Sequence, residues 1–266
     1  MRDKITEMDL PSKGEFHHYL IAGDWHGDHL DDSCYSILKS YAKTLPKYQR
    51  NLIINGDFAN ADFLMSKKKD FKRYIKLNTG IEDYFLPKAN EEIDFLNFVL
   101  DDLGKVFNQI IYIMGNHDHR YNLFRESCCP FAYRDDFNLE KRLKLKKRGI
   151  IVVNNNDWLD IGKVAITHGQ WEGRDCKDRH FVACGKSVIF SHVHSSECKA
   201  YAVRNETKKA WSLPIMSGLS PEFLGNRENN WTNGFGHLIV KSNGNFQLDV
   251  KEIWDNELIY GNKIIR

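Results

Sequence analysis

The sequence predicts an α/β protein whose central sheet begins with parallel strands. Short apolar runs end abruptly in polar residues, and stretches with helical spacing lie between these runs. Continuous apolar runs of this length are typical of strands that are buried on both faces. Their alternation with helices favours parallel pairing in the first half of the chain. The runs in question are residues 19–22, 52–54, 110–114, 163–166 and 188–190.

Two helices are predicted from apolar residues spaced three or four positions apart. The first stripe is stopped by Pro46 and consists of Ile37, Leu38, Tyr41 and Leu45. The second has Asn90 as its expected N-cap and Gly104 just past its end. Its members are Ile93, Leu96, Leu100 and Leu103.

The second half of the chain has a different pattern. Residues 210–217, 235–241 and 245–253 are expected to form strands, and the turn at 242–245 favours antiparallel pairing. Residues 220–233 are expected to form a long polar loop. We interpret residues 58–90, approximately, as an insertion near the site, because lysines and aromatic residues interrupt the strand pattern there.

The composition excludes several classes of protein. With 266 residues, 42% of them hydrophobic and 28% charged, the chain fits a single globular domain over 1–266. The net charge of +2 is too small to indicate a nucleic-acid partner by itself. No signal peptide or membrane-length apolar run is apparent, so we expect no membrane partner. The six cysteines lack metal-site spacing, and we expect free thiols in a reducing cytoplasm.

All five predicted strands end in side chains that can bind a metal ion. Ligands bind beyond the carboxyl ends of strands in such sheets, so these side chains are expected to meet. Two carboxylates, one amide and four imidazoles suit two divalent ions that share a bridging carboxylate. The candidate ligands are Asp24, His26, Asp57, Asn116, His168, His192 and His194.

Each candidate also has an ordinary structural explanation when it is taken alone. Asp24, Asp57 and Asn116 fit turns or helix caps after strands. The histidines fit hydrogen-bonded positions in the core. However, candidate ligands occur together at the ends of all five strands, and the first three of these ends also have a neighbouring glycine. This joint occurrence favours a metal site over the separate structural explanations.

The ordered blocks resemble the calcineurin-like metallophosphoesterase superfamily over residues 20–194. The blocks are Gly23-Asp24-x-His26-Gly27, Gly56-Asp57, Gly115-Asn116-His117-Asp118, His168-Gly169 and His192-x-His194. The resemblance implies a β-sandwich of mixed sheets flanked by helices, in four layers, with the site at one edge of the sandwich. Ser191 departs from the pattern, because this family usually has glycine at that position.

The resemblance also implies a role for each residue. Asp24, His26 and His194 would bind the first metal ion. Asn116, His168 and His192 would bind the second, and Asp57 would bridge the two. His117 would contact the phosphate or protonate the leaving group, and Asp118 would orient His117.

The activity implied by the resemblance is two-metal hydrolysis of a phosphate ester, with hydroxide from a shared water as nucleophile. We expect Mn²⁺ first, and Fe, Zn or Ni also suit the ligands. Phe58-Ala59-Asn60 after Asp57 departs from the Val-Asp-Arg-Gly segment of the protein-phosphatase branch. We therefore expect a phosphodiesterase or nuclease acting on nucleic acid or nucleotides. A phosphomonoesterase or protein phosphatase is the alternative, and a non-catalytic scaffold is the alternative from another class.

Several features bear on the substrate, and each has two interpretations. The basic run 141–148 is either a contact for a phosphate backbone or the carboxyl end of a helix. Lys67, Lys68 and Lys69 either bind single-stranded nucleic acid with Phe71, Arg73 and Tyr74 or form a solvated helix face. Arg120, Arg125 and Arg134 either clamp a phosphate or form surface salt bridges. Trp231 either lines the site or is a buried core residue.

Overall fold

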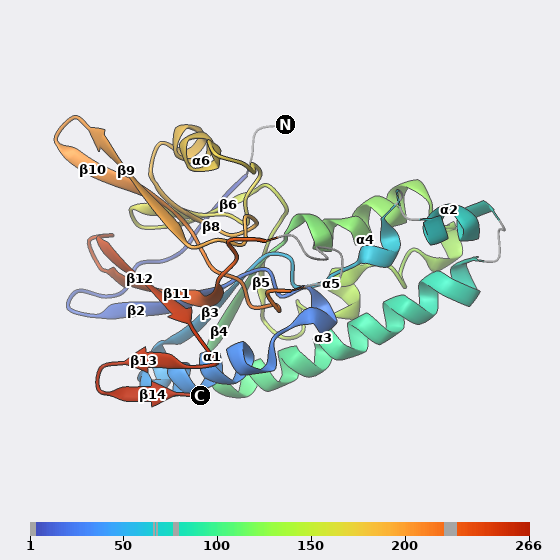
Figure 1. Ribbon diagram of the computed structural model, residues 1–266, viewed down its shortest axis with the longest axis horizontal. Helices are drawn as coiled ribbons and strands as arrows, with labels where there is room; N and C mark the ends of the chain where they lie inside the picture. The colour runs from blue at the N-terminus through green and yellow to red at the C-terminus, as the bar shows by residue number, and fades with distance from the viewer. Residues whose placement is uncertain (1–3, 66, 68, 77–79, 221–227) are drawn as a thin grey trace.

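The protein is a β-sandwich with helices on its outer faces, as the resemblance implies (Figure 1). The structure is a computed structural model that describes residues 4–65, 67, 69–76, 80–220 and 228–266. Two six-stranded sheets pack face to face. None of the described helices is long and apolar enough to cross a bilayer.

The first sheet contains the predicted parallel strands. β2, β3, β4 and β5 pair in parallel, and β11 pairs antiparallel with both β2 and β12. In spatial order the strands are β12 (Phe246–Ile253), β11 (Asn233–Lys241), β2 (Phe16–Ala22), β3 (Arg50–Asn55), β4 (Gln109–Ile113) and β5 (Ile151–Val153).

The second sheet is mixed and carries the last two ligand blocks. β7 pairs in parallel with β8, and a β9–β10 hairpin extends from the body (Figure 1). Sequence patterns did not predict β1, β6 or β9, because these strands are short or largely polar. In spatial order the strands are β1 (Ile5–Glu7), β6 (Trp158–Ile161), β7 (Val164–Ile166), β8 (Ser187–Phe190), β10 (Glu206–Ser212) and β9 (Glu197–Val203).

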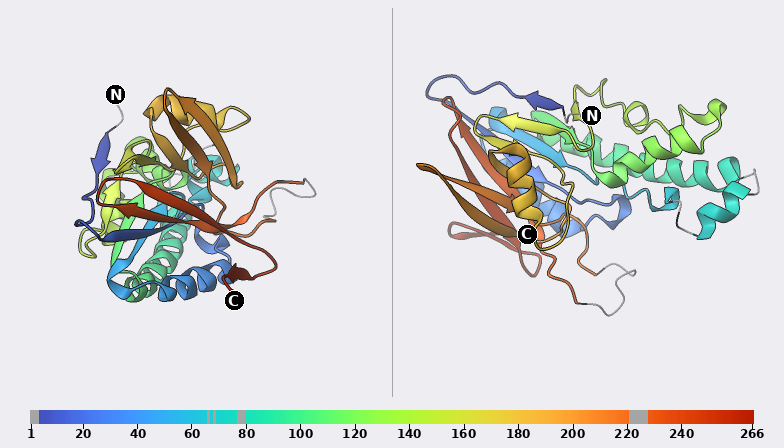
Figure 2. Two further views of the ribbon diagram at one scale, coloured as in Figure 1. Left: turned by 90° about the vertical axis from the view of Figure 1, so that its left-hand side faces the viewer. Right: turned by 90° about the horizontal axis from the view of Figure 1, so that it is seen from above.

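The helices lie outside the two sheets (Figure 2). α1, α3 and α4 contribute to the core that covers the outer face of the first sheet, and α6 contributes to the core beside the second. A small hairpin, β13 (Leu258–Tyr260) and β14 (Lys263–Ile265), follows β12. The helices are α1 (Asp32–Thr44), α2 (Lys69–Lys76), α3 (Leu86–Val106), α4 (Asn116–Ser127), α5 (Leu139–Arg142) and α6 (Cys176–Cys184).

Strands β2 to β4 are buried on both faces, which explains their continuous apolar sequence. Tyr19 and Ile21 point into the core between the sheets. Leu20 and Ala22, the intervening residues, point into the core under the helices. The alternation follows from the two-residue period of a strand.

Three boundary predictions were wrong. α3 begins at Leu86 with a proline in its first turn, so Asn90 lies inside the helix and is not its N-cap. Gly104 also lies inside it, because Phe107 is the C-cap. The strand expected at 210–217 begins earlier, at Glu206, and ends at Ser212. Part of the polar loop expected at 220–233 lies outside the described residues.

At Gly162, the turn between β6 and β7 of the second sheet lies close to the turn between β11 and β12 of the first sheet. A Cβ atom there would lie 2.7 Å from both Cα and O of Gly244, in the β11–β12 turn. The Lys163 amide donates a hydrogen bond to the Gly244 carbonyl at 3.0 Å. Gly162 has a φ of +59°, and so does Gly261, whose Cβ would meet nothing within 4 Å.

This pair gives a test of the packing between the sheets. Gly261→Ala bears only the cost of the left-handed backbone, roughly 1 kcal/mol. Gly162→Ala also forces the two turns apart, so we expect it to lower the free energy of unfolding by a further 1–3 kcal/mol, roughly. Urea denaturation followed by circular dichroism measures both. Equal losses would show that the contact between the turns contributes nothing.

Candidate metal centre

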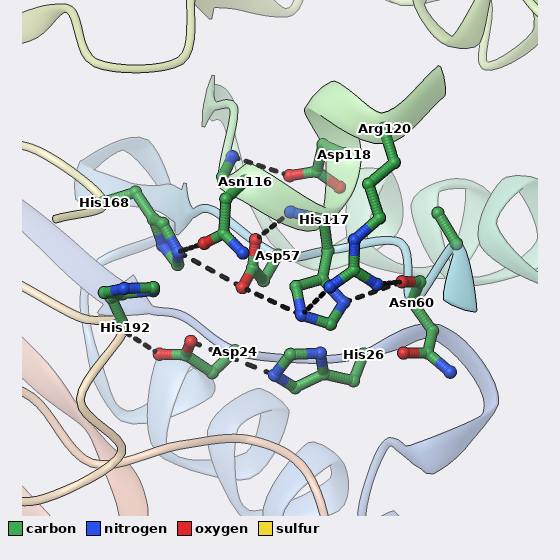
Figure 3. A network of polar contacts seen from close by, with 12 residues as sticks. Asp24, His26, Asp57, Asn60, Asn116, His117, Asp118, Arg120, His168 and His192 are labelled. Atoms are coloured by element: carbon green, nitrogen blue, oxygen red, sulfur yellow. Dashed lines mark hydrogen bonds and ion pairs between the residues drawn. The ribbon is translucent and has the colours of Figure 1, made fainter. Parts of the chain in front are cut away.

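The five predicted ligand blocks meet at one edge of the sandwich. The blocks that follow β2, β3 and β4 of one sheet face the blocks that follow β7 and β8 of the other (Figure 3). Among the described residues, three groups of His and Asp side chains have donor atoms within 4.8 Å of one another. Six of the seven predicted ligands belong to these groups, and Asn116 contacts one of them.

The first group consists of Asp24, His26 and His194. Nε2 of His194 lies 3.2 Å from Oδ1 of Asp24 and 3.3 Å from Nε2 of His26. Asp24 is fully buried, and its Oδ1 has no hydrogen-bond partner among the described residues. A buried carboxylate oxygen without a partner is costly in free energy. A cation at this point would satisfy it, so the donor set fits a metal ion.

The second group consists of Asp57, His168 and His192. Nε2 of His168 lies 3.2 Å from Oδ2 of Asp57 and 3.1 Å from Oδ1 of Asn116. Asp57 also belongs to the third group, with His26 and His117. It therefore lies between the two sets of donors, where a bridging carboxylate has to lie.

Backbone contacts orient these donors. The carbonyl of Asn55 can only accept, so His168 donates to it through Nδ1 at 2.8 Å and turns Nε2 toward the site. The amide of His192 donates to Oδ2 of Asp24 at 3.0 Å. Sequence patterns could not predict the role of Asn55, because a backbone carbonyl makes this contact.

Glycines leave room for the donors. A Cβ atom on Gly56 would lie 2.2 Å from Nδ1 of His168, and one on Gly115 would lie 2.0 Å from Oδ1 of Asp57. Such distances are far below van der Waals contact. The glycines of the second and third blocks are therefore needed for Asp57 and His168 to approach these turns.

The donors themselves have unusual backbone conformations. Left-handed φ values between 49° and 71° occur at Asp24, His26, Asp57, His192 and His194. Non-glycine residues with positive φ are uncommon, and each costs of order 1–3 kcal/mol. Such strain clusters at functional sites, where the surrounding structure holds it in place.

Ser191 is accommodated by a side chain from the neighbouring sheet. Its hydroxyl accepts a hydrogen bond from Nδ2 of Asn55 at 2.8 Å, and the residue is fully buried. Gly23 makes this possible, because a Cβ atom there would lie 2.3 Å from the serine Oγ.

Charge and burial together set the ionisation of the centre. Burial by itself raises the pKa of Asp57, but His168, His117 and His26 outweigh it and hold this pKa well below the ordinary value. Burial lowers the pKa of His26 to about 3. Asp57 is therefore an anion and His26 a neutral imidazole, and these are the forms that bind a cation.

His117 lies beside the donors and is held by two neighbours. It donates through Nδ1 to the carbonyl of Asn60 at 2.7 Å, which leaves Nε2 facing the site. This Nε2 lies 4.0 Å from Oδ2 of Asp57 and accepts from Nη2 of Arg120 at 2.8 Å. Arg120 also donates to the Asn60 carbonyl and pairs with Asp62 at 2.7 Å. Arg120 therefore forms the salt bridge that one of its two interpretations predicted, although it also lies beside His117.

Asp118 does not orient His117, contrary to the prediction. Its carboxylate accepts from the amides of Ala59 at 2.7 Å and Gly115 at 2.8 Å, which ties the loop after β3 to the start of α4. Burial and then the charge of Asp57 raise the pKa of Asp118 to about 7. The role predicted for it belongs to Asn60 and Arg120.

Two further residues border the centre. The ring of Trp231 lies 4.3 Å from that of His194, so this tryptophan lines the site. Glu172, which the sequence patterns did not single out, lies with Oε1 3.0 Å from Nε2 of His192. Glu172 follows the fourth block, His168-Gly169, within a few residues. This closeness in the sequence was the only feature that could have indicated its place beside the site.

The basic segments have mostly structural roles. In the run 141–148, Arg148 pairs with Asp101 of α3, and Arg142 donates to Asn90 at 2.8 Å. The run is helical only to Arg142 and continues as turns. Phe71 is buried against Phe85 and Phe124, so it offers no stacking face. Lys68 and the side chain of Tyr74 lie outside the described residues.

The sequence profile of the calcineurin-like phosphoesterase family matches residues 17–197, more than half of the chain. The protein belongs to this family. The matched region contains every candidate ligand.

Two solved structures are similar to this chain at low sequence identity. One is Vps29 from Chaetomium thermophilum, at 9% identity, a TM-score of 0.40, and coverage of 88% of this chain and 96% of that chain. The other is the hypothetical protein PH1004 from Pyrococcus horikoshii OT3, at 12% identity, a TM-score of 0.40, and coverage of 88% and 87%. No curated protein matches this chain.

The geometry predicts that Asp57 is indispensable for metal binding. Asp57→Asn removes the charge between the two donor sets, so we expect it to lose most of both ions, whereas the wild type binds about two per chain. Mass spectrometry of metal-reconstituted protein measures the content. The matched control is Asp160→Asn, which alters a buried carboxylate paired with Lys186, outside the groups. Wild-type protein that binds no metal would rule out the two-metal site.

Proposed function

We propose that this protein hydrolyses phosphate esters with two divalent metal ions. The observation that carries the proposal is the convergence of seven donor side chains, among which Oδ1 of buried Asp24 faces the ring nitrogens of His194 and His26 at 3.2 and 4.0 Å. The first ion would be held by Asp24, His26 and His194, and the second by Asn116, His168 and His192. Asp57 would bridge them.

The chemistry that such a pair supplies is neutralisation of phosphate charge and activation of water. The protein's own contribution is orientation. Asn60 fixes the ring of His117 so that Nε2 faces the site, and Arg120 presents a guanidinium next to it. A phosphate oxygen or a leaving-group oxygen at this point can accept a hydrogen bond from Arg120, and it can accept one from His117 when Nε2 is protonated. Arginine is well suited to this task, because its planar fork matches two phosphate oxygens.

The narrower proposal is that the ester belongs to a nucleotide or nucleic acid and that Mn²⁺ is the preferred metal. Lys67 supports it, because this lysine and Arg120 line the same cavity of about 420 Å³. The segment after Asp57 also lacks the protein-phosphatase pattern. A substrate panel with added Mn²⁺ tests this, using p-nitrophenyl monoesters and diesters, cyclic nucleotides, DNA, RNA and phosphopeptides. Preference for monoesters or phosphopeptides would contradict it.

A non-catalytic scaffold is the less favoured function. A scaffold has no need to keep strained donors together, yet five of the seven donors have left-handed backbone conformations here. Strain of this kind persists at sites where geometry matters for function. Absence of turnover on every substrate in the panel, with metal bound, would favour the scaffold.

His117 provides the first kinetic test. His117→Ala removes a group beside the donors, so we expect normal metal content and a decrease in the chemical rate of at least about 10²-fold. We expect a smaller decrease for p-nitrophenyl esters than for alkyl esters, because a good leaving group needs less protonation. Single-turnover rates and metal analysis measure both quantities.

Two outcomes would revise this role. Loss of metal along with activity would make His117 a ligand, as its place in the third donor group allows. Equal decreases across leaving groups would assign it to phosphate contact instead.

Lys67 and Lys69 provide the test of nucleic-acid binding. If both contact a phosphate backbone, Lys67→Ala/Lys69→Ala should flatten the salt dependence of oligonucleotide affinity by up to about two units of slope. Fluorescence anisotropy at several salt concentrations measures this slope. Lys146→Ala/Lys147→Ala is the control, because it removes the same charge from exposed positions in the other basic run. Identical slopes for the two variants would exclude a specific contact at Lys67 and Lys69.

A further inference from the structure

A cavity of about 600 Å³ lies beside the His117 side of the candidate metal centre. Asn60 and Asp62 line it, and these residues also contact His117 and Arg120. Asp28, two residues after His26, lines it as well. Figure 3 shows Asn60 next to His117 and Arg120. A phosphate at the centre would therefore place one of its ester groups at the entrance of this cavity.

The position of this cavity distinguishes it from a larger one. A cavity of about 730 Å³ is lined by Asn51 and Gln109, at the amino ends of β3 and β4. The metal donors follow the carboxyl ends of the same strands, so the larger cavity lies at the opposite edge of the sheet and cannot receive the substrate.

The wall of the smaller cavity combines aromatic rings with negative charge. Phe63, Tyr84 and Phe95 are half-buried and line it. Five carboxylates line it against two lysines, Lys69 and Lys88. The carboxylates are Asp28, Asp62, Asp70, Glu91 and Glu92. Asp62 is paired with Arg120 and Glu92 accepts from backbone amides, so the other three carboxylates leave a small excess of negative charge over the two lysines. This excess repels phosphate groups, whereas aromatic rings attract flat organic groups.

One side of the cavity is fixed in advance. Oε1 of Glu92, on α3, accepts from the amides of Asn60 at 2.8 Å and Ala61 at 2.9 Å. Oε2 of the same residue accepts from the hydroxyl of Tyr121, on α4, at 2.7 Å. The loop after β3 is thus tied to two helices. A site that is ordered before binding loses less entropy when its ligand arrives.

We propose that this cavity binds the base of a nucleoside phosphoester whose phosphate lies at the metal centre. This proposal rests on the proposed function. A base stacks on aromatic side chains, and carboxylates accept hydrogen bonds from its amino groups and from ribose hydroxyls. The volume is within the range of pockets for small molecules. The negative wall disfavours a neighbouring phosphate, so the cavity favours a base over a polynucleotide backbone, and the Lys67→Ala/Lys69→Ala variant tests the opposite case of a backbone beside Lys69.

The first experiment measures ligand affinity and does not depend on turnover. Isothermal titration of Mn²⁺-loaded protein compares the four nucleoside 5′-monophosphates with ribose 5-phosphate and phosphocholine. We expect at least one nucleotide to bind about tenfold more tightly than ribose 5-phosphate, the ratio that stacking of one base supplies. Equal affinities would overturn the proposal. Tighter binding of phosphocholine would also overturn it and assign the cavity to an organic cation.

The aromatic wall is tested with a pair of variants on α3. Phe95→Ala removes a ring from the cavity, and Phe98→Ala removes a ring that is 69% exposed on the same helix. We expect Phe95→Ala to reduce the preference for nucleotide over ribose 5-phosphate at least threefold, and Phe98→Ala to leave it unchanged. Circular dichroism and metal content confirm that each variant is folded.

A charge reversal decides between base and backbone by the sign of its effect. Glu91→Lys places a cation in the wall at an exposed position, and Asp94→Lys makes the same change on α3 outside the cavity. If the cavity holds a base, Glu91→Lys weakens nucleotide binding relative to Asp94→Lys. If it holds a second phosphate, Glu91→Lys strengthens the binding of an oligonucleotide, and the proposal is wrong.

Hydrolysis of p-nitrophenyl phosphate and bis-p-nitrophenyl phosphate, assayed in parallel, separates the two proposals. If nucleotide preference is observed and is lost in Phe95→Ala, but neither ester is hydrolysed, the base site stands and the proposed function is wrong. If either ester is hydrolysed without any nucleotide preference, the proposed function stands and the base site is wrong.

Discussion

The Asp57 carboxylate, only 1% exposed, is held between the amino terminus of α4 and the ring of His168. Its Oδ1 accepts from the amide of His117 at 2.8 Å, and positive charge at a helix amino terminus favours an anion there. A buried carboxylate is costly unless its oxygens are satisfied. The protein supplies one amide and several imidazoles around Asp57. Two cations bound by this carboxylate would satisfy its remaining oxygen lone pairs. The approach of α4 and of His168 to Asp57 depends in turn on Gly115 and Gly56.

Backbone hydrogen bonds connect the Asp57 block and the His168 block to neighbouring ligand blocks. The amides of Trp25 and His26 both donate to the carbonyl of Asp57, at 3.0 and 2.8 Å. In the second sheet the amide of Ser191 donates to the carbonyl of His168 at 2.8 Å. Each block is therefore fixed by its neighbour, and each comes directly after a strand whose side chains are packed in the core between the sheets. This packing explains how strained φ values persist at five donors.

Local periodicity and the order of the blocks were enough to predict, from the sequence, the five strands that precede the ligand blocks and the side chains that meet after them. The apolar runs located β2, β3, β4, β7 and β8, and the polar residues after them proved to meet in space. The start of α3 was not predicted, because the chain is already helical well before Asn90, in the π-helical turn Ile81–Phe85 that runs directly into α3. Asp118 was assigned to His117 in error, since side chains one residue apart on a helix do not face each other. The contacts of Asn55, Asn60 and Glu92 depend on tertiary structure and leave no pattern in the sequence.

The ion pair between Arg120 and Asp62 divides the surroundings of His117 into two regions of opposite charge. Arg120 lines a cavity together with Lys67, and Asp62 lines the neighbouring cavity together with Asp28 and Glu91. An anionic group beside His117 is therefore attracted toward the arginine and repelled from the carboxylates. A phosphoester with one anionic and one aromatic end can bind across this pair in only one favourable direction. Since attack on phosphorus requires the leaving group to lie opposite the nucleophile, a site that fixes the direction of binding also selects which ester bond is broken.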